Sequence, residues 1–233
     1  MESPQPVHYL PIATTVVSLL FLLVLTSRAM KRGWPPHLIW WGVGVFFYGF
    51  GTALESAITL HGNSVALNRF WYIAGAILGG YPLATGSVYF LLSRKIAHTL
   101  TGISLSVVLV TTFLVLVCPI EAASLEPHRP SGSVLQWQWV RWMTPFINLY
   151  AAIFLIGGAF YSAARFLFLR SSLGRAIGTF LIAVGAILPG IGGGYAKAGY
   201  VEALYVGELG GLILIWIGYE VCVRSPLPQR EDS

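Results

Sequence analysis

The sequence predicts an all-α membrane protein with seven transmembrane helices, and three observations lead to this fold class. The 233 residues are 56% hydrophobic and only 10% charged, and the mean hydropathy is +0.73. Soluble domains carry about 25% charged residues. The apolar residues also fall into runs of about 18–25 residues, which is the length that crosses a bilayer as a helix. We therefore expect contact with a lipid bilayer throughout.

We expect the seven helices at residues 9–30, 38–60, 69–92, 100–120, 143–168, 176–196 and 201–223. The connecting segments are too short for a soluble module. The sequence therefore predicts one transmembrane domain, residues 1–223, followed by a disordered cytoplasmic tail, residues 224–233.

The basic residues predict the orientation. Ten of the fourteen Lys and Arg residues fall on one side of the predicted membrane and four on the other, the four being Arg69, Arg129, Arg141 and Lys197. Cytoplasmic loops carry the excess of basic residues. This places the amino terminus outside and the carboxyl terminus in the cytoplasm, in a multi-pass protein of the cell membrane. Because the basic residues lie at span ends, the net charge of +5 does not indicate a nucleic-acid partner.

Two acids interrupt the apolar runs, Glu55 in the second predicted helix and Glu208 in the seventh. A carboxylate inside a spanning helix costs on the order of 2.5–3.5 kcal/mol, so it must face protein or water and often marks a functional site. Both lie in the predicted outer half of the bundle. We expect them to face one outward-opening pocket for a small molecule. The alternative is that each acid is neutralised separately, by protonation, a hydrogen bond or a contact between helices.

Polar residues at helical spacing extend this predicted ligand-binding site. Tyr48 and Thr52 share a face with Glu55, and Tyr205 shares one with Glu208. The full set of expected ligand-binding residues is Glu55, Glu208, Tyr48, Thr52, Tyr72, Tyr205, Arg69, Lys197, Gly192 and Gly193. Within this set, Arg69 or Lys197 would supply the countercharge for the acids.

Gly192 and Gly193 belong to the run from Leu188 to Gly194, which contains Pro189 and four glycines. Such a run is a poor helix former. It predicts either a break that offers free backbone groups beside Glu208, as in transporters, or a frayed helix end leading into a tight loop. In the third helix, Pro82 predicts a kink, and glycines in the second and third helices predict close packing.

The one long connection, residues 121–142, has a polar first half and a tryptophan-rich second half. The tryptophans indicate an aromatic belt at the membrane surface. The alternative is a lid over an outward-facing cavity.

The sequence indicates no catalytic group and no metal site, and it leaves any cofactor unassigned. The lysines stand at helix ends, no histidine lies inside a predicted span, and the single Asp is residue 232. The leading prediction is a binding or transport protein for a small molecule. The alternatives are a non-catalytic subunit or sensor that packs on a partner membrane protein or on a second copy, and an intramembrane enzyme acting on a lipid-like substrate.

Overall fold

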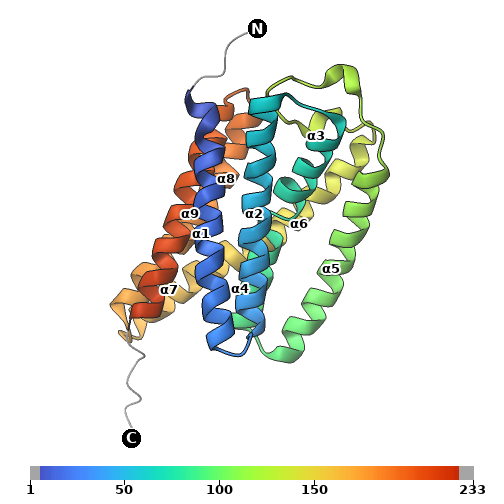
Figure 1. Ribbon diagram of the computed structural model, residues 1–233. Coiled ribbons are helices and arrows are strands. Elements are labelled where there is room, and N and C mark those ends of the chain that lie inside the picture. Colours follow the sequence, from blue (N-terminus) through green and yellow to red (C-terminus); the bar gives the residue numbers. More distant parts are fainter. Residues whose placement is uncertain (1–5, 226–233) are drawn as a thin grey trace, which may run out of the picture. The chain divides into compact units, whose positions relative to one another are not determined.

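A computed structural model describes residues 6–225, apart from the side chain of Lys197. Seven helices in this part of the chain are long and apolar enough to span a membrane (Figure 1). They are Pro6–Lys31, Pro36–His61, Val65–Leu91, Arg94–Val117, Gln138–Phe168, Leu173–Ala196 and Val201–Arg224. The predicted fold class is therefore confirmed, while the orientation in the membrane stays a prediction. Of the predicted tail, residues 226–233 lie outside the described residues, and Arg224 closes the last helix.

The chain groups into two compact units, of which one ends at Ala152 and the other begins at Ile153. The single-domain organisation stays a prediction. The first unit contains α1 (Leu10–Lys31), α2 (Pro36–His61), α3 (Val65–Trp71), α4 (Tyr81–Leu91), α5 (Arg94–Val117) and α6 (Met143–Ala151). The second contains α7 (Gly158–Phe168), α8 (Leu173–Lys197) and α9 (Val201–Arg224).

Helix α2 is the centre of the first unit, because it packs against α1, α3 and α4. Its glycines allow these close approaches, as predicted. A Cβ atom at Gly44 would lie 2.8 Å from the backbone nitrogen of Leu83 in α4, and one at Gly49 would lie 2.7 Å from Cβ of Ser18 in α1. Figure 1 shows α1 and α2 running side by side.

The third span is not one regular helix. After α3 the chain forms a π-helical segment, Tyr72–Ile77, in which the Leu78 amide bonds the Ile73 carbonyl at 2.9 Å. A short turn then leads into α4, which carries Pro82 in its first turn. Proline fits there because the first amides of a helix have no intrahelical acceptor. The predicted disruption at Pro82 is present, and the π-helical segment that precedes it is an additional feature.

The α5–α6 loop, residues 118–137, is folded onto the first unit. Val134 and Leu135 are buried, and Leu135 joins the core cluster that contains Tyr72, Val115 and Ile147. Trp139 and Trp142, in the short helical turn that follows, are exposed, as a membrane-surface belt requires. The polar first half is therefore a loop as predicted, while its second half contributes to the core.

In the second unit, α8 and α9 are joined by a tight turn and pack closely. Glycines on α8 and α9 bring the two backbones together, as Gly185 faces Gly211 and Gly178 faces Gly218. Helix α8 continues through Pro189 and the four glycines to Lys197. The break, one of the two predicted alternatives, is therefore wrong. The other alternative is correct in that a tight turn follows before Val201, but the glycine run itself is regular helix. The packing against α9 compensates for the poor helix propensity of the glycines.

Candidate functional site: the buried acid Glu55

Glu55 is the most deeply buried acid of the described chain, with 2% of its surface exposed. It lies six residues before the end of α2 at His61, which is about 9 Å along the helix axis. The indole Nε1–H of Trp71 donates a hydrogen bond of 2.7 Å to Oε1 of Glu55. A polar side chain so deep in an apolar bundle requires such a partner. Glu55 is thus held by protein, as the sequence predicts.

The local fold explains how Trp71 reaches α2. Helix α3 begins after Ser64, whose hydroxyl accepts a hydrogen bond from the Leu67 amide at 3.2 Å, and it ends at Trp71. The π-helical segment that follows crosses α2 at a pair of glycines. A Cβ atom at Gly51 would lie 3.5 Å from Cα of Gly75, and one at Gly75 would lie 3.7 Å from Nε1 of Trp71. This close approach of two backbones places the indole against Glu55.

Hydroxyl groups continue from this point towards α1. Thr52 is buried one turn before Glu55, and its Oγ1 lies 2.9 Å from Oγ1 of Thr15 in α1. The Thr15 hydroxyl donates to the Pro11 carbonyl at 2.8 Å. Tyr48, one turn before Thr52 on α2, is half-buried. Tyr48, Thr52 and Glu55 therefore follow one another on α2 at spacings of about one turn, and Thr15 of α1 adjoins Thr52.

The two predicted site residues of the third span contact other partners. Nη2 of Arg69 donates to the Cys118 carbonyl at 2.7 Å, at the carboxyl end of α5. The Tyr72 hydroxyl lies 2.8 Å from Oγ1 of Thr144 in α6. Arg69 and Trp71 are two residues apart on a helix and so point in different directions. Arg69 accordingly stabilises the end of α5, where a cation is favourable, and the Glu55 partner on this helix is Trp71.

The remaining predicted site residues belong to the second unit. Glu208 is half-buried on α9, and Tyr205 is buried on the same helix. A Cβ atom at Gly192 would lie 2.6 Å from the Ala203 carbonyl, so this glycine packs α8 on α9, whereas one at Gly193 would meet no atom within 4 Å. The Lys197 side chain lies outside the described part of the structure. A pocket shared by Glu55 and Glu208 stays a prediction.

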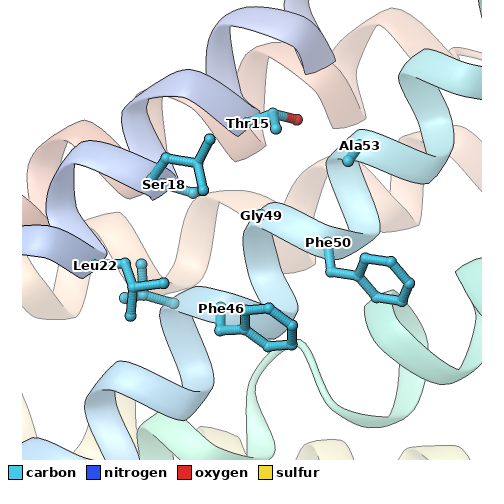
Figure 2. A pocket seen from close by; sticks show the side chains of 9 residues that line it. Thr15, Ser18, Leu22, Phe46, Gly49, Phe50 and Ala53 are labelled. Atoms are coloured by element: carbon cyan, nitrogen blue, oxygen red, sulfur yellow. The ribbon is translucent and has the colours of Figure 1, made fainter. Parts of the chain in front are cut away.

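An apolar groove of about 240 Å³ lies between α1 and α2 (Figure 2). The rings of Phe46 and Phe50 stack along it with centroids 6.1 Å apart. The hydroxyl-bearing residue Thr15 lies at its edge and connects it to Thr52. The groove is lined by Thr15, Ser18, Leu19, Leu22, Val45, Phe46, Gly49, Phe50 and Ala53. Such a surface fits hydrocarbon and offers little to a polar ligand.

Comparison with known proteins gives no family for the chain, since no family model, no curated protein and no solved structure matches it. Within residues 6–225, no group of three His, Cys, Asp or Glu side chains is arranged to hold a metal ion.

The Glu55–Trp71 pair leads to a first prediction. Trp71→Phe removes a donor to a buried acid and should lower the free energy of unfolding by about 1.5–3 kcal/mol, the range for hydrogen bonds to charged groups. In a Glu55→Leu background the same change should cost clearly less, because the acceptor is already gone. Unfolding in mixed micelles measures both steps of this double-mutant cycle. Trp142→Phe, at a 72% exposed position, is the control and should have little effect.

Proposed function

We propose that the chain is a multi-pass membrane protein that binds or transports a small molecule together with a proton, and that Glu55 is the group that takes up and releases the proton. The observation that carries this proposal is the 2.7 Å hydrogen bond from the Trp71 indole to a carboxyl group that is 2% exposed. Ionisable residues buried in spanning helices commonly mark proton relays and substrate pathways.

The surroundings of Glu55 act on its protonation in opposite directions. Burial disfavours the charged form of a carboxyl group, while a donated hydrogen bond favours it. Movement of a donor therefore shifts the balance between the two forms. Trp71 is such a donor, since it is the last residue of α3 and stands directly before the π-helical segment.

The π-helical segment supplies a means of moving that donor. A π turn holds one extra residue within a helix, and such turns are frequent at functional sites. If the extra residue were absorbed into regular α-helix, Trp71 would turn by about 100° relative to α4 and leave Glu55. The close contact of Gly51 with Gly75 leaves room for this backbone to slide against α2, because no side chain stands between them.

The role of a subunit receives less support. Its grounds were the small size of the chain, the lack of a predicted soluble module, and glycine-lined faces that could pack on a partner. In the described structure, Gly44 and Gly49 pack α2 within the first unit, and Gly185 and Gly211 pack the two long helices of the second. These faces are therefore covered by the chain's own helices. No observation adds to the alternative of an enzyme acting on a lipid-like substrate.

Chemical labelling tests whether Glu55 takes up a proton. Dicyclohexylcarbodiimide is an apolar reagent that modifies protonated carboxyl groups in membranes. In the full chain reconstituted into liposomes, we expect peptide mapping to find Glu55 modified, with a rate that falls as the pH rises from 5 to 9. The exposed loop residue Glu121 is the internal control and should react much less. Modification of Glu121 without modification of Glu55 would contradict the proposal.

Proton flux tests the transport step. In liposomes with a trapped pH dye and an imposed pH gradient, Glu55→Gln should reduce proton flux to the level of empty liposomes. Glu121→Gln is the matched control and should leave the flux of the unaltered protein in place. Equal flux in Glu55→Gln and in the unaltered protein would exclude Glu55 as the proton-carrying group.

A further inference from the structure

One end of the first unit carries positive charge without any acid. The α1–α2 and α4–α5 connections meet at this end (Figure 1). Five cationic residues lie in or next to these connections, namely Arg28, Lys31, Arg32, Arg94 and Lys95. The acids of the described first unit are Glu55, inside α2, and Glu121 and Glu126, in the α5–α6 loop. The positive end therefore has no acidic residue in its own connections.

His37 marks the point where the two connections converge. Its ring makes edge contacts with Trp41 and Phe90, at centroid distances of 5.2 and 5.4 Å. The positive charges of Arg32 and Arg94 both act on this half-buried imidazole, one from each connection. A Cβ atom at Gly86 would overlap the Trp41 ring, so the indole is tightly packed and keeps His37 in place.

These three side chains are available to bind a ligand. Among the described residues, the ring nitrogens of His37 and the guanidinium groups of Arg32 and Arg94 make no hydrogen bond to the protein, and both arginines are exposed. Two guanidinium groups within electrostatic reach of an imidazole offer the hydrogen-bond donors that suit a phosphate group. An anion is the occupant that this charge arrangement favours.

The adjacent surface indicates where that phosphate comes from. Large apolar side chains are exposed next to the cations, with Met30 and Phe90 each 59% exposed and Ile96 51% exposed. Trp34, in the α1–α2 connection, is also exposed. A phospholipid matches this surface, because its phosphate would meet the cations and its acyl chains would meet the apolar side chains. Basic residues at span ends attract anionic headgroups. A free phosphate would leave the apolar surface uncovered.

We propose that this end of the first unit binds an anionic phospholipid, with the headgroup phosphate between Arg32 and Arg94 and against His37, and with the acyl chains along Met30 and Phe90. The site stands apart from Glu55 and does not depend on the proposed function.

Lipid titration of the full chain in nonionic detergent tests the proposal, with the apparent melting temperature as the readout. Phosphatidylglycerol should raise the melting temperature, whereas phosphatidylcholine and inorganic phosphate at the same concentrations should not. In R32Q/R94Q the phosphatidylglycerol concentration needed for half of the effect should rise about tenfold or more, since each basic residue near the membrane surface contributes to headgroup attraction. R129Q/R141Q removes two arginines elsewhere in the unit and should titrate like the unaltered protein.

Two further variants separate binding from folding. R32K/R94K keeps both charges and should retain most of the phosphatidylglycerol effect. R94Q alone, at an exposed position, should give a smaller rise than the double variant. Equal stabilisation by phosphatidylcholine, or an equal loss in R129Q/R141Q, would overturn the proposal. Stabilisation by inorganic phosphate alone would overturn the assignment to a lipid.

Discussion

Gly211→Ala is expected to lower the free energy of unfolding by about 1–3 kcal/mol, which is the usual cost of overpacking a tight interior. The new Cβ atom would lie 2.5 Å from the Gly185 carbonyl oxygen and 3.0 Å from Cδ of Pro189. Backbone and proline ring cannot turn aside as a flexible side chain can, so α8 and α9 would have to separate. Unfolding of the full chain in mixed micelles, followed by helix content, measures the loss.

Pro189 makes position 211 especially sensitive to substitution. A proline inside a helix leaves the carbonyl four residues earlier without its usual donor. That carbonyl belongs to Gly185, which is the group nearest to the missing side chain of Gly211. A Cα–H of glycine can approach such a carbonyl closely and partly replace the lost hydrogen bond. An alanine at position 211 removes this contact as well as introducing the clash.

Gly190→Ala is the matched control, since it makes the same chemical change inside the same helix pair. A Cβ atom there would meet no atom within 4 Å. Alanine is the better helix former by up to about 1 kcal/mol, so this variant should be neutral or more stable. Equal destabilisation by both substitutions would mean that the contact of α8 with α9 does not depend on the glycines.

The seven spans could be predicted because each is a long apolar run, and hydropathy alone reports such runs. The ends of the helices were harder to predict. Helix α5 begins at Arg94, six residues before the predicted start at Leu100. Polar residues can continue a helix beyond the hydrocarbon, where hydropathy no longer marks them. It ends at Val117, since Pro119 follows closely and cannot extend it.

The glycine-rich run of α8 was misjudged because local propensity was considered without packing. Gly178, Gly185 and Gly192 recur every seven residues on α8, and Gly211 and Gly218 do so on α9. A seven-residue spacing keeps small residues on one helix face. Such a face permits two backbones to approach closely. This repeat is visible in the sequence and indicates an intact helix rather than a broken one.

Only part of the candidate site could be predicted from the sequence. Glu55 was found because a single charge in an apolar run is conspicuous. Its partner was missed because the direction of Trp71 depends on the π-helical segment. The hydrophobic periodicity of the sequence does not predict such a segment. The need of an indole inside a spanning helix for a hydrogen-bond acceptor was the available signal. Arg69, one of the two expected partners, lies two residues away and therefore on a different face of the helix.

Asn68→Ala is expected to release the α5–α6 loop from the first unit. Asn68 is buried, and its amide mimics a backbone pairing with Ser131. Its Nδ2 donates to the Ser131 carbonyl at 2.8 Å, and its Oδ1 accepts from the Ser131 amide at 2.9 Å. Each lost bond leaves a half-buried backbone group of Ser131 unsatisfied, at a cost of about 1–3 kcal/mol. Amide hydrogen exchange over residues 129–136 should become faster, because the loop opens to water.

Two variants distinguish the effect of the Asn68–Ser131 hydrogen bonds from a general loss of stability. Asn68→Asp keeps the acceptor for the Ser131 amide and loses the donor, so its exchange rates should fall between those of the other two proteins. Asn148→Ala removes an exposed asparagine of α6 and should leave exchange in the loop unchanged. Leu135 would still favour the core, since it is fully buried there. If exchange in Asn68→Ala stays at the original rate, burial of Leu135 rather than the asparagine holds the loop closed, and a lid that opens at Ser131 is excluded.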